Sequence, residues 1–399
     1  MPWRQTEPMN ERARFVTAVE SGVFSMSELC REYGISRKTG YKWMERFHDD
    51  GYAALEDRSR APHTCPHEMP IEISELVIQT RKDHPRWGAR KLIVHLANKY
   101  LALAEQLPSA TRAFALLKRS GYITERKCRN RSAHPGCSPI VANAPNDLWS
   151  IDFKGQFRTL NKQYCYPLTV TDALSRYLLA CDGLVSTAYE GARPVLERLF
   201  QECGLPLAIR SDNGAPFCST ALGGLSRLSI WWMKLGIGHQ RNRPGKPQDN
   251  PRHERMHSTL KQETIRPPAQ DIALQQQRFD AFRLEFNCER PHEALNMRTP
   301  ASIWRPSTRT MPQRLRAPEY ASHMQVRSVR SNGEIKFGGR FYFVSELLVN
   351  ERVALEEIDD GLWSVMFYET LLARLDIRKQ RLLSFRPKTI EPNSGSVGV

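Results

Sequence analysis

The first fifty residues alternate apolar and polar positions with the period of short amphipathic helices. We expect one helix from about Glu11 to Ser21, a second from Met26 to Tyr33, and a third from Arg37 to Phe47. Gly34 would end the second helix, and Ser36 is the expected N-cap of the third. Three short helices with this spacing predict a helix-turn-helix domain over residues 1–55.

A second helical pattern follows after a linker rich in proline and polar residues, expected at 56–70. Its helices are predicted from Ile71 to about His84, from Gly88 to about Tyr100, and from the N-cap Ser109 to a stop at Gly121. With a basic connector, this module would span 71–131. Basic side chains favour a second DNA-binding module, and a packing adaptor is an equally open alternative.

The pattern changes at about residue 145 to short apolar runs with the period of strands. The expected strands are 148–153, 164–171, 176–181 and 207–210, with an amphipathic helix at 193–203 before the last of them. A sequence of strand, hairpin, helix and strand predicts an α/β domain, over 140–310, with helices packed on a sheet.

The C-terminal segment carries short alternating runs separated by turn sequences at 331–333, 338–339 and 359–361. This pattern predicts a small β-barrel over 322–385. The remaining residues, 386–399, are expected to form a disordered tail.

Charge narrows the choice of partner. The chain has 58 Lys and Arg against 43 Asp and Glu, a formal net charge of +15, which favours a polyanion such as nucleic acid. No apolar run reaches the length of a membrane span, and the first residues lack the apolar stretch of a secretory signal. We therefore expect a soluble cytoplasmic protein without a membrane partner.

Cysteine usage argues against a disulfide framework. The nine cysteines are an odd number, lie far apart and form no CxxC pair. His63, Cys65 and His67 could be zinc ligands, but no second ligand pair follows at the spacing of a zinc finger, so we interpret this segment as linker.

The outward face of the third helix is basic and rich in hydrogen-bond donors, as a recognition helix in the major groove requires. Its expected DNA-binding residues are Arg37, Lys38, Thr39, Tyr41, Lys42 and Arg46. A helical bundle with a solvated basic face is the alternative.

Three acidic residues are candidates for chemistry. Asp152 lies on a predicted strand, with Ile151 and Phe153 on the opposite face. Asp212 follows another strand, at the strand tip where α/β proteins form their sites. Glu254 falls in the first turn of a helix that we expect to start after Asn250 and to run to about residue 265.

Each acid has an ordinary explanation when it is taken alone: a turn residue, a partner of the helix dipole, or a solvent-facing strand position. Together they would bring three like charges into one site. Two carboxylates about 4 Å apart repel by roughly 4 kcal/mol at an effective dielectric near 20, so the cluster needs cations. Oxygen ligands without His or Cys favour Mg²⁺ or Mn²⁺.

The segments around these acids resemble one family. Asp152 in WSIDFKG, Asp212 in RSDNGAPF and Glu254 in RPGKPQDNPRHERMHSTLKQE are similar to the Asp, Asp, Glu motif of insertion-sequence transposases that share the retroviral-integrase catalytic core, a ribonuclease-H-like fold. Residues 286–300 (FNCERPHEALNMRTP) resemble the segment that closes that core. The resemblance covers the chain from about residue 10 to 310.

One spacing departs from the family pattern. Between Asp212 and Glu254 lie 41 residues, more than is usual in the family, and the excess is expected within 220–234. A shorter gap would put Gln248 at the third position, and an amide cannot replace a carboxylate. Glu254 is therefore assigned by its surrounding motif.

The resemblance implies a DNA transposase that binds the terminal repeats of its mobile element and performs metal-dependent end cleavage and strand transfer by in-line phosphoryl transfer. Asp152, Asp212 and Glu254 would be both catalytic residues and ligands of two Mg²⁺ (or Mn²⁺) ions. Lys154, Arg255 and Lys261 are expected to contact phosphates.

The implied partners are double-stranded DNA, both element ends and target, and further copies of the chain in a homo-multimer assembled on DNA. The implied location is the prokaryotic cytoplasm. Two alternatives stay open: a DNA-binding regulator or assembly factor with an inactive integrase core, and a structure-selective nuclease.

Overall fold

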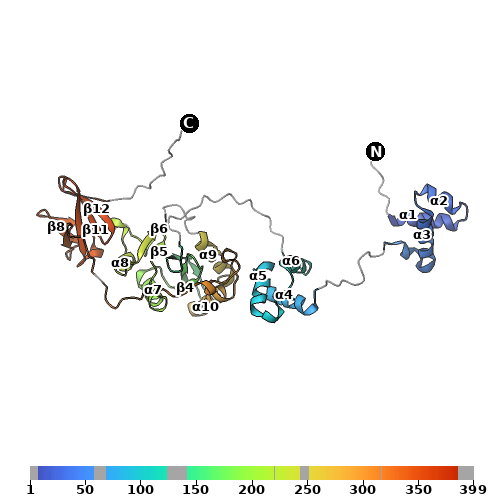
Figure 1. Cartoon of the computed structure of the whole chain (residues 1–399), viewed down its shortest axis with the longest axis horizontal. Coiled ribbons are helices and arrows are strands. Elements are labelled where there is room, and N and C mark those ends of the chain that lie inside the picture. The colour runs from blue at the N-terminus through green and yellow to red at the C-terminus, as the bar shows by residue number, and fades with distance from the viewer. Residues whose placement is uncertain are drawn as a thin grey trace, which may run out of the picture. The chain divides into compact units, whose positions relative to one another are not determined.

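The computed structural model describes residues 8–57, 69–123, 142–219, 221–242, 251–315 and 317–384 (Figure 1). The chain divides into two compact units, Met1–Pro70 and Ile71–Val399. The group formed by His63, Cys65 and His67, the basic connector and the expected tail lie outside the described residues. The finer domain boundaries expected from the sequence stay predictions.

The first unit is a bundle of three helices with a short 3₁₀ turn. Its elements are α1 (Pro8–Glu20), α2 (Met26–Glu32), α3 (Arg37–Asp50) and η1 (Gly51–Leu55). Ser36 caps α3, because its side chain accepts a hydrogen bond from the Thr39 amide. Gly40 lies so close to α1 and α2 that a Cβ there would be 2.7 Å from the Cys30 sulfur and 3.0 Å from Phe15. The third helix therefore packs closely against the first two.

The second unit begins with the second helical module, formed by α4 (Ile71–Asp83), α5 (Ala89–Lys99), a 3₁₀ turn η2 (Leu101–Leu103) and α6 (Ala110–Arg119). Ser109 is the N-cap of α6, as expected. Within this unit, Arg86 hydrogen-bonds Gln262 and the His95 ring hydrogen-bonds the backbone of Glu289. The module therefore contacts the α/β domain that follows it.

The α/β domain contains a mixed six-stranded sheet with helices around it. Its elements are β1 (Leu148–Phe153), β2 (Phe157–Arg158), β3 (Tyr164–Asp172), β4 (Leu178–Leu184), α7 (Tyr189–Cys203), β5 (Ala208–Ser211), η3 (Leu222–Gly224), α8 (Arg227–Lys234), β6 (Gly238–Arg241), α9 (Pro251–Thr264), α10 (Ile272–Cys288), η5 (Glu293–Leu295) and α11 (Pro300–Ile303). The strand order is β2-β3-β1-β5-β6. β4 pairs with β3 along the edge of β3 opposite to β1. β1 is antiparallel to β3 and parallel to β5, and β5 is parallel to β6.

The sheet is covered on both faces. Trp149 and Ile151 of β1 belong to one apolar cluster with residues of α7 and α8, such as Phe200 and Trp232. Met256 and Leu260 of α9 belong to another cluster, with the phenylalanines of α10. Alternate residues of β1 therefore face the two layers, which puts Asp152 on the side opposite Ile151, as predicted.

Polar contacts attach the C-terminal end of α10 and the residues just after it to the core. The Asn287 side chain bonds both the amide and the carbonyl of Leu178 at the start of β4. Arg290 forms an ion pair with Glu263 of α9, with a nitrogen to oxygen distance of 3.0 Å. These contacts hold α9 and α10 against the same face of the sheet.

The C-terminal region is built from short antiparallel strands. They are β7 (Gln325–Ser328), β8 (Glu334–Phe337), β9 (Arg340–Phe343), β10 (Arg352–Asp359), β11 (Leu362–Phe367), β12 (Thr370–Asp376) and β13 (Arg381–Ser384), with a 3₁₀ turn η6 (Glu346–Leu348) before β10. Five strands form one sheet in the order β13-β12-β11-β10-β7, and β8 pairs with β9. This sheet has two open edges among the described residues, so the predicted closed β-barrel is not confirmed.

The C-terminal strands pack against the α/β domain. Leu225 and Ile230, at the start of α8, share a buried cluster with residues such as Leu355 and Leu372 of the five-stranded sheet. Among the described residues, no helix has the length and apolar character needed to cross a membrane.

Candidate active site

Asp152 and Asp212 come together because their strands are neighbours. β1 and β5 run parallel, with Leu148 level with Ala208 and Ser150 level with Arg210. Asp152 is the second residue past this paired stretch and Asp212 directly follows β5, so both lie at the carboxyl ends of the two strands, and the charge of Asp212 acts on Asp152. Such an edge is where open α/β sheets form their sites.

Glu254 reaches this edge from α9. It lies in the first turn of the helix with its side chain exposed, whereas Met256 and Leu260 are buried against the sheet. Its charge acts on Asp152 and raises the pKa of that carboxyl. The structure therefore brings all three predicted acids to one side of the domain.

The pKa of Asp152 reflects the closeness of the other two acids. Burial, followed by the neighbouring charge of Asp212, raises the pKa of Asp152 to about 7, and Glu254 adds to the rise. Partial desolvation also raises the pKa of Asp212, against a hydrogen bond that its carboxylate accepts from the Gly214 amide. A carboxyl that is hard to ionise beside two others is a place where a cation would be stabilising.

The donor set fits hard divalent cations. All three side chains offer only oxygen, the ligand that Mg²⁺ and Mn²⁺ prefer. Their oxygens do not all lie within 4.8 Å of one another, since the close groups of possible metal ligands among the described residues do not include this trio. Bound cations would therefore draw the carboxylates closer together.

Two buried histidines beside Asp152 were not predicted. His253 and His257 are one turn apart on α9, and the Nε2 atom of each lies 2.7 Å from the Thr169 hydroxyl oxygen of β3. Nδ1 of His257 is 3.8 Å from the Asp152 carboxylate, and Nδ1 of His253 is 2.8 Å from the Thr171 hydroxyl oxygen. Histidines at i and i+4 opposite threonines two apart on a strand are the sequence signal that could have revealed them.

Of the expected phosphate-binding residues, Lys154 lies near this edge. Lys154 follows β1, and its charge lowers the pKa of Asp152. Arg255 and Lys261 are exposed on α9. Asp172, the last residue of β3, is 1% exposed and accepts hydrogen bonds from Ser175 and from the Asn146 amide.

The basic face of α3 is present in the first unit. Arg37, Lys38, Tyr41 and Lys42 are exposed, whereas Thr39 is half-buried and its hydroxyl lies 2.9 Å from that of Ser36. Arg46 is also half-buried, with its guanidinium carbon 5.0 Å from the centre of the Trp43 ring. Thr39 is therefore the one of the six whose side chain contacts the N-cap residue Ser36. The other five are exposed or half-buried and do not take part in the cap.

Five family models match the chain. Integrase core domain models match residues 142–247 and 235–300, a helix-turn-helix model matches 11–63, and a homeodomain-like model matches 39–106. The C-terminal domain of IS481 family transposases matches 324–383. The chain thus has the domain composition of an insertion-sequence transposase with an integrase-like core.

Similar proteins come from bacterial mobile elements and from retroviruses. The chain is 30% identical over 189 residues to an uncharacterized 31.7 kDa protein of the insertion element IS407 from Burkholderia multivorans, covering 47% of this chain and 61% of that protein. It is 28% identical over 222 residues to the Gag-Pol polyprotein of Baboon endogenous virus, covering 50% of this chain and 12% of the polyprotein. The chain therefore spans less than two thirds of the length of these relatives.

Among solved structures, the catalytic core domain of HTLV-2 integrase in complex with magnesium is similar. Its identity is 15% and its TM-score 0.33, covering 41% of this chain and 99% of that one.

Proposed function

We propose that this chain is a DNA transposase that binds the ends of its mobile element and catalyses their metal-dependent cleavage and joining to target DNA. The observation that carries the proposal is the shared edge of β1 and β5, where the charges of Asp212 and Glu254 both raise the pKa of the Asp152 carboxyl. The domain composition supports the same function.

The three carboxylates would hold two Mg²⁺ or Mn²⁺ ions. When bound, such ions about 3.5–4 Å apart supply the positive charge that stabilises the attacking and leaving oxygens of an in-line displacement at phosphorus. Asp152 sits on the rigid sheet and would fix the geometry, while Glu254, exposed on α9, would complete the ligand set.

The basic side chains would position the DNA. Lys154 lies close enough to the acids to affect Asp152, and Lys261 is on the exposed side of α9, so both would bind phosphates beside the reacting one. Arg255, the residue directly after Glu254 on α9, would do the same. The α3 face, Arg37 to Arg46, would read the element end in the major groove.

Joining two DNA ends requires that both be held, so we propose a homo-multimer assembled on DNA, acting in the bacterial cytoplasm. The bacterial insertion-element relative supports the cellular setting.

A strand-joining assay with Mg²⁺ tests the activity. The substrate is a duplex with the DNA that flanks the reading frame of this chain, and the proteins are the native chain, Asp152→Asn, Glu254→Gln and the control Asp280→Asn, an exposed acid on α10. We expect joined product with the native chain and the control, and its loss by at least about a thousandfold with the two site variants.

The alternatives give different results. Equal behaviour of all four proteins, with DNA bound but never joined, would establish a regulator with an inactive core. Cleavage without joining of 3′-hydroxyls would indicate a nuclease.

A further inference from the structure

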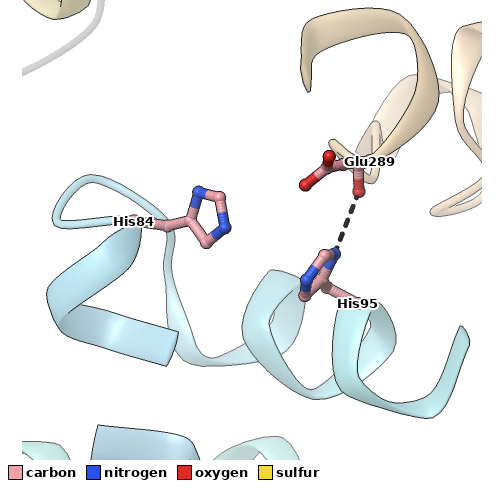
Figure 2. Close-up of side chains that lie close together, drawn as sticks. All are labelled: His84, His95 and Glu289. Carbon is pink, nitrogen blue, oxygen red and sulfur yellow. Dashed lines mark hydrogen bonds between the residues drawn. The ribbon is translucent and has the colours of Figure 1, made fainter. Parts of the chain in front are cut away.

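A second group of possible metal ligands lies away from the three carboxylates, where the second helical module meets α10. His84 directly follows α4, His95 belongs to α5, and Glu289 directly follows α10. One ligand atom from each of these residues lies within 4.8 Å of the other two. Figure 2 shows both rings and the Glu289 carboxylate gathered around one space.

The polar neighbours of the two rings leave one nitrogen of each available. Nδ1 of His95 lies 3.4 Å from the Glu289 carbonyl oxygen, which can only accept, so Nδ1 carries the proton and Nε2 keeps its lone pair. Nδ1 of His84 faces the Glu285 carboxylate at 3.7 Å. A histidine ligand typically directs its second nitrogen at a carbonyl or a carboxylate in this way.

Packing fixes the rings in place. The His84 ring stacks on Trp87 with centroids 3.9 Å apart and an interplanar angle of 12°, and the His95 ring meets the same indole edge-on at 5.2 Å. Trp87 is 1% exposed. Rings held by a buried indole lose little conformational entropy when they bind an ion, which favours tight binding.

Arg290, the residue after Glu289, is already engaged. Arg290 pairs with Glu263 at 3.0 Å, and it is 4.0 Å from the Glu285 carboxylate. Glu289, by contrast, is exposed, so its carboxylate can turn toward the two rings at small cost.

We propose that His84, His95 and Glu289 form a binding site for one borderline-soft divalent metal ion, most suitably Zn²⁺. Water would be its fourth ligand. Two imidazole nitrogens and one carboxylate match the ligands that zinc takes and differ from the all-oxygen set of the acidic site. The ion would link α5 and the end of α4 to the end of α10, and thereby strengthen the attachment of the second helical module to the α/β domain.

Co²⁺ is the probe for the test, because its visible absorption reports nitrogen ligation in a tetrahedral site. The full chain, treated with a chelator and dialysed, is titrated with Co²⁺ in excess Mg²⁺, which occupies oxygen ligands and competes poorly for imidazole. The experiment uses the Asp152→Asn background, since Asp152, His253 and His257 also lie close together. Quenching of tryptophan fluorescence that is absent from a Trp87→Phe protein gives a second signal at the site.

We expect one equivalent of Co²⁺ with tetrahedral absorption, displaced by Zn²⁺. His84→Asn and Glu289→Gln should weaken binding by at least about tenfold, while the control His323→Asn, an exposed histidine on the C-terminal side, should not change it. Far-UV circular dichroism identifies any variant that has lost its fold. His84→Asn is chosen because a substitution at this half-buried position should leave the protein folded.

Absence of tetrahedral Co²⁺ absorption would refute the site. The same conclusion follows if binding survives in both His84→Asn and Glu289→Gln, or is lost only when His257→Asn is added. Because metal binding is measured without DNA, the result is separate from the outcome of the strand-joining assay.

Discussion

The imidazole of His257 lies between Thr169 and Asp152, with Nε2 2.7 Å from the threonine Oγ1 and Nδ1 3.8 Å from the aspartate Oδ2. Oγ1 of Thr169 is also 3.1 Å from the Asp152 carbonyl oxygen, which can only accept. If the single hydroxyl proton is donated there, the Nε2 atoms of His253 and His257 must both be donors to Thr169. One threonine thus fixes the tautomers of two histidines beside the candidate site.

We predict that His257→Ala reduces strand joining by about tenfold or more and raises the Mg²⁺ concentration needed for half-maximal rate, because Asp152 loses the ring that packs against its carboxylate. His257→Gln, which can still bond Thr169, should lose less. Rates measured over a range of Mg²⁺ concentrations check this, with Thr259→Ala on the same helix as control. An unchanged Mg²⁺ dependence in His257→Ala would limit the ring to a packing role.

Asp152→Asn should stabilise the metal-free protein. Folding raises the pKa of this carboxyl to about 7, so above that pH its charged form is less favourable in the folded state than in the unfolded state. Because the side chain is 32% exposed, we expect a gain of only about 2 kcal/mol at pH 8. Denaturant unfolding with chelator measures the gain, and added Mg²⁺ should stabilise the native chain but not the variant. A less stable Asp152→Asn protein would contradict the view that the three carboxylates repel one another.

Arg37→Ala should weaken DNA binding and lower the slope of log affinity against log salt by about one. The reason is that an exposed guanidinium at the start of α3 is free to release a counterion from the phosphate backbone. Arg14→Ala, which removes an exposed arginine paired with Glu11 on α1, is the matched control. Filter binding over a salt series distinguishes the two, and equal slopes for native, variant and control proteins would place DNA elsewhere on this unit.

Local sequence signals were sufficient for the elements that carry the acids. The strand expected at 148–153 is β1 to the residue, and the helix expected from residue 251 to about 265 is α9, ending at Thr264. β1 alternates apolar and polar positions, and Pro251 marks the start of α9, so both have strong local signals.

The features that could not be predicted from the sequence depend on contacts between residues far apart in the chain. β6 was missed because Gly238–Arg241 is a short polar edge strand, stabilised by pairing with β5 and not by its own apolar pattern. His253 and His257 acquire their role only when α9 packs on β3, more than eighty residues earlier in the chain. The closed barrel was an extrapolation from turn signals, which predict hairpins but not whether the outer strands of a sheet meet.

Mild acid should destabilise the α/β domain through two half-buried histidines, His239 and His292. Burial, with the charge of Arg241, lowers the pKa of His239 to about 4, and burial, with Lys91 and Arg290, lowers that of His292 to about 3. In the folded chain both rings stay neutral, whereas the unfolded chain takes up protons near pH 6.5. Stability is therefore complete above about pH 6.5 and falls as the pH drops toward the folded pKa values.

Between pH 7.5 and 5.5 each of these two histidines should cost about 1 kcal/mol of unfolding free energy. His239→Gln, which can keep the contact with the Ser211 hydroxyl at 2.8 Å, should remove about that much of the pH dependence. Denaturant unfolding at the two pH values, followed by circular dichroism, gives the difference, and the exposed His323→Gln should leave it unchanged. A His239→Gln variant with the full native pH dependence would mean that the ring takes up its proton within the folded domain, so that β6 opens to solvent without global unfolding.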